Sequence, residues 1–410
     1  MKSFVLSCFT LFLFIGISAF AKDGSKDKIN IINKTLAQVA RTYLDINNIS
    51  TQIYNNGISD IDPNGNAGFV YPKGTGKTCV FTSGLLWGGL VQGDPQPRVG
   101  GTTYRTGLQP GAILSNGQAD DPTLDKYRIY RVRSDVKPGG PVVDLSAEAT
   151  NENTTVSVLQ QQFEKDWTEW PASLGAPYND VNHNGVYDPT VDVPGVPGAA
   201  QSIFYVANDL NQSLTTNLYG SSPIGIELHT IMWTYGKIEN FDNIYFRKYQ
   251  LINKSSLPVS DMYISLWSDP DIGDAGDDFA GCDTTLNLGY GYNASPIDQI
   301  YESNPPAVGF QLLEGPLAAG TSSDTGYFNN RTIVGKKNIP MTAFYYFTNS
   351  DPNTGDPPLG SGANEFYNFL QGRVGVTGNF FQNPQGEPTT FALSGDPVQG
   401  TGWIDGQLQS

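Results

Sequence analysis

Histidine is nearly absent from this chain, and its scarcity excludes several kinds of site. Only His183 and His229 are present, so a zinc site built from several histidines is excluded, and there is no H-E-x-x-H motif. No G-x-S-x-G nucleophile elbow accompanies either histidine, which argues against a serine hydrolase. Gly74–Thr78 ends like a phosphate-binding loop, but Tyr71 stands where that motif requires its first glycine, so we interpret the segment as a turn.

Cysteine is also scarce, with three residues in 410. Cys8 lies early in the apolar N-terminal run, where it is badly placed to become a lipidated first residue. In an oxidising compartment Cys79 and Cys282 could form a disulfide, but two separate buried thiols would explain them equally well.

Positive charge is in short supply. The chain has 24 Lys and Arg against 40 Asp and Glu, giving a net charge of -16. Such a chain should repel nucleic acid and anionic membranes, so we expect no nucleic-acid partner. Many of the carboxylates occur in short clusters with Asn and Gly, which favours cation binding.

Long hydrophobic runs are missing beyond the N-terminus, so we expect no transmembrane segment. Residues 1–21 predict a signal peptide, with Lys2, an apolar run over Phe4–Phe14 and the small-x-small site Ala19–Ala21. We therefore expect a secreted protein located outside the cell or on its outer surface.

Charged residues make up only 16% of the chain, whereas Gly (46), Pro (27), Tyr (21) and Phe (21) are abundant. This composition favours short strands joined by turns, and we predict an all-β protein with an immunoglobulin-like or jelly-roll-like β-sandwich and long Gly/Pro/Asp-rich loops. The one convincing helical period covers Ile29–Leu44, so residues 22–45 are interpreted as a leader helix or tail.

Turn signals divide the rest of the chain into three parts. Residues 46–150 are predicted to form a smaller β unit, residues 151–200 a linker with a short helix, and residues 201–410 the main sandwich. The strands predicted in the first unit are Ile49–Tyr54, Cys79–Phe81, Lys126–Arg133 and Val142–Leu145. Those predicted in the sandwich are Ile203–Val206, Ile224–Tyr235, Ile244–Ile252, Met262–Trp267, Thr342–Phe347 and Arg373–Val376.

The segment Asp180–Asp188 has the spacing of a calcium loop, with oxygen-bearing residues at positions one, three, five and nine and glycine at position six. Position twelve is Val191 instead of a bidentate glutamate, but Asp192 could close the site one residue later. We expect a weak structural calcium site, with ordinary Asn-Gly turns as the alternative. The predicted ligands are Asp180, Asn182, Asn184, the carbonyl of Val186, Asp188 and Asp192. Asp60–Gly65 repeats only the first half of this spacing and is interpreted as a turn.

A second acidic segment directly follows a predicted strand, and its carboxylates would repel one another without a cation or hydrogen-bond donors. We predict calcium here too, with a solvated loop or a carboxylate pair for glycoside hydrolysis as the alternatives. The candidate ligands are Asp269, Asp271, Asp274, Asp277, Asp278 and Asp283.

As a set, several longer stretches make most of the chain resemble large secreted proteins of Bacteroidota-type bacteria that are exported by the type IX secretion system. The matching stretches are Ile46–Ile49, Phe81–Gly89, Gly175–Pro189, Asn208–Asp209, Trp267–Asp271, Asp277–Asp283, Pro305–Gly309 and Gly402–Asp405. The resemblance implies an extracellular β-domain protein and carries over no catalytic residues. Such proteins often end in an immunoglobulin-like sorting domain, so we expect this chain to be a fragment of a longer protein.

Two functions remain open from the sequence. The first is a non-catalytic protein of the cell surface, with calcium-stabilised loops, that serves in surface structure, adhesion or binding of a polysaccharide or surface protein. The alternative is a carbohydrate-active enzyme that uses carboxylates of the Asp269–Asp283 segment beside aromatic platforms.

Overall fold

The all-β prediction is confirmed by the computed structural model, in which strands account for 36% of the residues and helices for 12%. The structure describes the backbone of residues 5–10 and 16–18, and backbone and side chains of residues 40–236, 238–329, 331–348 and 351–406. Two short strands lie inside the predicted signal peptide, whose other residues, like residues 22–39, lie outside the described residues. The signal peptide stays a prediction.

The strands occur along the whole described chain. They are β1 (Val5–Thr10), β2 (Gly16–Ser18), β3 (Arg41–Leu44), β4 (Thr51–Tyr54), β5 (Phe69–Val70), β6 (Thr78–Val91), β7 (Arg98–Gly101), β8 (Gln109–Pro110), β9 (Tyr130–Arg133), β10 (Tyr178–Asn179), β11 (Val193–Pro194), β12 (Gln201–Asn208), β13 (Ile226–Thr234), β14 (Phe246–Asn253), β15 (Val259–Pro270), β16 (Asp278–Asp283), β17 (Leu288–Asn293), β18 (Ile297–Asp298), β19 (Glu302–Ser303), β20 (Val308–Gln311), β21 (Leu317–Ala319), β22 (Thr325–Phe328), β23 (Arg331–Val334), β24 (Lys336–Asn338), β25 (Tyr346–Thr348), β26 (Phe381–Gln382) and β27 (Pro388–Thr389). The helices are η1 (Asp125–Tyr127), α2 (Ser146–Asn151), α3 (Val156–Thr168), η2 (Ala172–Leu174), α4 (Gln212–Tyr219), η3 (Ala275–Asp277) and α5 (Ala363–Leu370). No helix among the described residues is long and apolar enough to cross a membrane.

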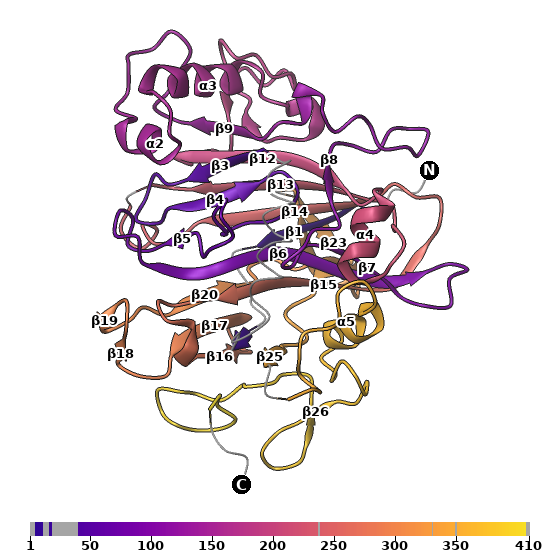
Figure 1. Cartoon of the computed structure of the whole chain (residues 1–410). Coiled ribbons are helices and arrows are strands. Elements are labelled where there is room, and N and C mark those ends of the chain that lie inside the picture. Colours follow the sequence, from indigo (N-terminus) through magenta and orange to yellow (C-terminus); the bar gives the residue numbers. More distant parts are fainter. Residues whose placement is uncertain are drawn as a thin grey trace.

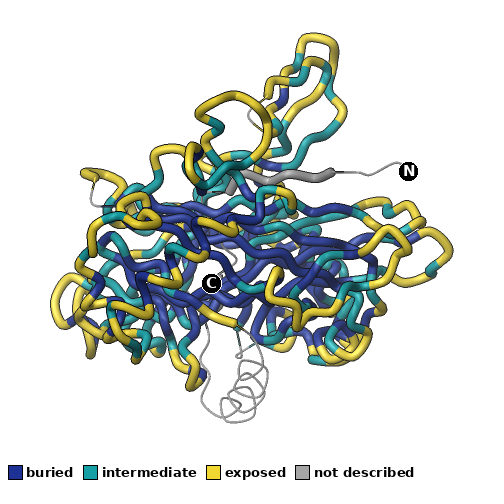
Figure 2. The backbone as a smooth tube through the Cα atoms, turned by 90° about the horizontal axis from the view of Figure 1, so that it is seen from above, coloured by how far each residue is buried: buried dark blue, intermediate teal, exposed yellow. Residues whose placement is uncertain are grey.

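Two antiparallel sheets form the middle of the molecule. The central sheet has the order β1-β14-β13-β12, with β8 and β9 also paired to β12, and the second sheet contains β15, β6, β5 and β7. Figure 1 shows α2 and α3 on one side of the central sheet, the second sheet on its other side, and β16, β17 and β20 beyond that. Burial is concentrated in these layers, and exposure in the loops around them (Figure 2).

Strand β12 shows why the central sheet is covered on both faces. All eight of its residues are buried. Because side chains alternate along a strand, Ile203 and Tyr205 face the main core toward the second sheet, whereas Phe204 and Val206 face a smaller core. That smaller core includes Trp167 from α3. Helix α3 therefore covers the outer face of the central sheet.

The predicted first unit and the predicted main sandwich contribute strands to the same sheets. From the first unit, β9 pairs with β12 in the central sheet, and β6 pairs with β15 in the second sheet. The short β10–β11 hairpin lies within the predicted linker and packs through Tyr178 and Val193 on the smaller core. The sandwich type, immunoglobulin-like or jelly-roll-like, stays a prediction.

Three local predictions are wrong, and two are right only in part: Lys126–Arg133 forms a strand only over Tyr130–Arg133, after η1, and Thr342–Phe347 only from Tyr346. Arg41–Leu44 was assigned to a helix but forms β3, because its backbone pairs with β4. Val142–Leu145 is irregular, and Val142 is 79% exposed, so its β-branched residues do not pack in a sheet. Arg373–Val376 makes only an isolated bridge from Arg373 to Phe380, in the turn that follows α5.

A buried ion pair connects the loop after β4 to the central sheet. Arg247 Nη2 lies 2.7 Å from Asp60 Oδ2, and the two residues are 4% and 0% exposed. Thr51 Oγ1 and Tyr245 OH donate to Asp60 Oδ1 at 2.6 and 2.9 Å, and Ser83 also donates to this carboxylate. The hydroxyl groups replace the water that both charges lose on burial.

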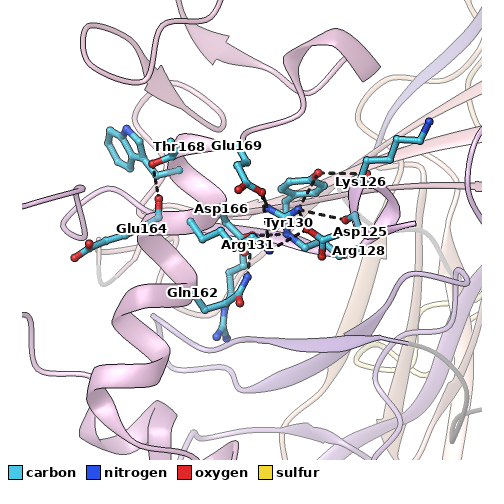
Figure 3. A network of polar contacts seen from close by, with 12 residues as sticks. Asp125, Lys126, Arg128, Tyr130, Arg131, Gln162, Glu164, Asp166, Thr168 and Glu169 are labelled. Atoms are coloured by element: carbon cyan, nitrogen blue, oxygen red, sulfur yellow. Dashed lines mark hydrogen bonds and ion pairs between the residues drawn. The ribbon is translucent and has the colours of Figure 1, made fainter. Parts of the chain in front are cut away.

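A second network fixes α3 to β9 (Figure 3). Arg128 Nε lies 3.0 Å from Asp166 Oδ1, and its other nitrogens reach Asp125 at 3.0 Å and Glu169 at 2.9 Å. The backbone N–H of Arg131 donates to Asp166 Oδ2 at 3.0 Å. Burial nevertheless outweighs these donors and raises the pKa of Asp166 to about 6.

This pKa predicts a pH dependence of stability. The folded state binds a proton at Asp166 more tightly than the unfolded chain does. The stability gained from this proton is therefore complete below pH 4 and is lost as the pH rises through 6. We expect wild type to lose stability relative to Asp166→Asn between pH 4 and 7, measured by urea unfolding at each pH. A difference that does not change with pH would contradict this prediction.

Candidate calcium-binding loops

The predicted calcium loop is a closed turn between two paired strands. Tyr178 and Asn179 of β10 pair with Pro194 and Val193 of β11, so the ends of the segment 180–192 lie side by side. His183 and Gly185 have positive φ angles of 58° and 75°, which bend the chain sharply. The glycine at position six thus supplies the left-handed backbone that a tight ligand loop requires.

Carboxylate and amide oxygens turn into this loop and accept its backbone N–H groups. Asp180 accepts from Asn184 N at 3.1 Å and from Gly185 N at 2.7 Å. Asn182 accepts from Asn184 N at 3.1 Å, and Asn184 accepts from Val186 N at 2.8 Å. Three of the predicted ligands therefore face the inside of one turn.

Asp192 closes the loop from the opposite side. It is 2% exposed, and its carboxylate accepts from Val181 N at 2.9 Å and from Asp188 N at 2.8 Å. Asp188 itself accepts from the backbone and hydroxyl of Thr190, which lower the pKa of its carboxyl. Val186 is 66% exposed.

The six aspartates of the second acidic segment do not form one cluster. Asp269 lies on β15 and accepts from Tyr104 OH at 2.7 Å, and Asp274 accepts from Gly276 N at 3.1 Å. Asp283 is bound to Thr285 at the far end of β16, about 16 Å along the strand from Asp278.

Asp269, Asp271 and Asp277 all remain near Asp278, because each interacts electrostatically with its carboxyl. Burial, followed by the charge of Asp278, raises the pKa of the Asp271 carboxyl. Burial also raises the pKa of Asp278, to about 8, although the backbone N–H of Ile272 donates to its Oδ2 at 2.8 Å. The charges of Asp277, Asp298 and Asp269 add to this increase. Sequence spacing could not indicate Asp298, because β17 lies between it and this segment in the chain.

Within the described ranges, no three His, Cys, Asp or Glu side chains are grouped closely enough to hold a metal ion. A calcium site in the described parts would therefore need Asn side chains, backbone carbonyls or water beside its carboxylates. The loop 180–192 meets this requirement with Asn182 and Asn184, whose oxygens face the same turn as the Asp180 carboxylate.

The remaining candidates from the sequence have structural partners. Asp60–Gly65 is a turn, as predicted, in which Gly65 N donates to Asp62 O at 3.1 Å. Cys79 and Cys282 are separate buried thiols and do not form a disulfide. His229 Nε2 lies 2.8 Å from Glu227 Oε1 and its ring packs on Phe204, so it is held within the wall of the central sheet.

Comparisons with protein-family profiles, with curated proteins and with solved structures find no match for this chain.

Proposed function

We propose that this is a non-catalytic extracellular protein whose β-sandwich is stiffened by calcium in the loop 180–192. The inward-facing oxygens of this loop, closed by Asp192 one residue after the usual position twelve, carry the proposal. Without a bidentate glutamate the affinity should be weak, roughly 10⁻⁴ to 10⁻³ M, which suits extracellular calcium and a structural role.

The location of the loop supports a stabilising role. The β10–β11 hairpin packs through Tyr178 and Tyr187 on the smaller core, and Tyr187 OH donates to Trp167 O of α3 at 2.5 Å. A cation in the loop would therefore stiffen the layer that covers the central sheet. Surface structure, adhesion or binding of a polysaccharide or surface protein is the role we assign to such a scaffold.

Glycoside hydrolysis is less well supported. That chemistry needs two carboxyls facing a cleft that admits a sugar ring. Asp269 and Asp278 are only 3% and 4% exposed, and Tyr104 and Ile272 N respectively occupy one oxygen of each. Their burial favours a structural role over a catalytic one.

Calcium should raise the melting temperature of wild type more than that of Asp180→Ala/Asp188→Ala, which lacks two ligands of this loop. At a calcium concentration tenfold above Kd the stabilisation is about 1.4 kcal/mol, which corresponds to a rise of roughly 1 to 4 °C. Differential scanning calorimetry in millimolar calcium chloride measures this. Asp121→Ala, which removes an exposed aspartate bound to Thr123 in another turn, is the matched control and should respond like wild type.

Magnesium demands tighter octahedral geometry and should stabilise less than calcium at equal concentration. A wild-type melting temperature that does not respond to calcium would reject the proposed site.

A further inference from the structure

A pair of residues opposite each other on β16 and β17 lies at the edge of the second acidic segment. Asp278 pairs directly with Asn293, so their side chains emerge on the same face of the sheet with Cβ atoms about 5 Å apart. Asp277, at the end of η3, joins them because Asn293 Nδ2 donates to its Oδ2 at 2.9 Å. Three oxygen-bearing side chains are therefore immediate neighbours.

Hydrogen bonds fix the orientation of the Asn293 amide. Its Nδ2 donates to Asp277 Oδ2 and to the carbonyl oxygen of Ser295 at 3.0 Å, with a longer contact to Ile297 O at 3.4 Å. Because the nitrogen is committed to these acceptors, Oδ1 is the remaining polar atom of this side chain. That atom is buried and accepts no hydrogen bond from the described residues.

Two carboxylate oxygens share this condition. Oδ1 of Asp277 and Oδ1 of Asp278 are also buried without a hydrogen-bond partner among the described residues. Asp278 as a whole is 4% exposed. A buried side-chain oxygen without a partner is costly, since it loses its hydration and regains nothing from the protein. Three such oxygens on neighbouring side chains indicate a ligand that supplies positive charge.

The surroundings are also negative. Asp298 is 3% exposed, and although burial favours its neutral form, the backbone N–H groups of Tyr301, Asp274 and Ile300 hold the pKa of its carboxyl below the usual range. Within the parts that the structure describes, Asp277, Asp278 and Asp298 form no ion pair with a Lys, Arg or His side chain. No described cation of the protein neutralises this group.

We propose that Asp277, Asp278 and Asn293 bind a second divalent cation through their Oδ1 atoms. The donor set is all oxygen, which selects a hard ion, and calcium tolerates the irregular geometry and the water ligands that three side chains would leave to be filled. The proposal is independent of the loop 180–192. It places the cation between the β16–β17–β20 sheet and the segment that leaves β15.

The experiment counts calcium ions bound to the full-length chain, which retains β1 of the central sheet, by isothermal titration calorimetry with calcium chloride. Asp180→Ala/Asp188→Ala, which removes ligands of the loop 180–192, should still bind one ion. Adding Asp278→Asn to that variant should abolish the remaining binding. Adding Asp283→Asn instead should leave it intact, because Asp283 lies at the far end of the same strand.

Terbium luminescence gives a second readout, because Tyr292 adjoins Asn293 and can sensitise a bound lanthanide. If Asp278→Asn does not fold, as judged by near-UV circular dichroism, Asp277→Asn replaces it at a half-buried position. A folded Asp180→Ala/Asp188→Ala variant that binds no calcium overturns the second site, whatever the behaviour of the loop. Calcium that remains bound after either asparagine substitution also overturns it.

Discussion

Asp60→Asn is expected to lower the free energy of unfolding by about 3 to 5 kcal/mol, because it leaves the charge of Arg247 buried without its main counterion. The two residues are 0% and 4% exposed, and their ion pair spans 2.7 Å. Asparagine suits this position because the φ angle of Asp60 is 71°, a conformation that Asn adopts more readily than most residues. The substitution therefore changes charge more than backbone strain.

Urea unfolding of three variants tests whether the loss comes from the uncompensated charge. Asp60→Asn/Arg247→Leu should recover much of the stability lost in Asp60→Asn, since removing both charges removes the desolvation penalty. Asp94→Ala is the control, because its ion pair with Arg98 lies at the surface and should contribute less than about 1 kcal/mol. Equal losses for the single and double variants of the Asp60 pair would show that shape, not charge, is decisive.

The strands of the central sheet could be predicted because their residues carry a local signal. Ile203–Val206 is a run of apolar and aromatic residues, and it became the middle of β12, buried on both faces. Helix α5 escaped prediction because Phe366 and Phe369 are aromatic residues common in strands, and only the tertiary core against which they pack makes this segment helical. Tertiary packing, not local preference, decides such segments.

The loop 180–192 could be predicted from local sequence, whereas the group around Asp278 could not. The loop is set by its own spacing, because Asp180, Asn184 and Gly185 lie within six residues of one another. Asn293 lies beside Asp278 only because of the register of β16 against β17, and local sequence does not predict this register. Sequence patterns therefore indicate candidate sites that are built from one turn, and they miss side chains that a neighbouring strand contributes.

Asp209→Ala is expected to destabilise the protein by about 3 kcal/mol or more, since it orphans three buried backbone donors at once. Asp209 follows β12 and is 0% exposed. Its Oδ2 accepts from Ile224 N at 2.9 Å, and its Oδ1 from Gly225 N at 2.9 Å and Ile226 N at 2.8 Å. This carboxylate thus sets the entry of the chain into β13.

The size of the loss should follow the number of acceptors that remain. Asp209→Asn keeps Oδ1 for Gly225 and Ile226 but turns an NH₂ group toward Ile224 N, so it should fall between wild type and Asp209→Ala in urea unfolding. Burial raises the pKa of Asp209 to about 6, despite these donors. The wild-type advantage over Asp209→Asn should therefore shrink as the pH rises from 4 to 7, because the folded state holds the proton that asparagine does not need. If both variants unfold at the same urea concentration as wild type, the three N–H groups have found other acceptors, and the carboxylate does not organise this strand.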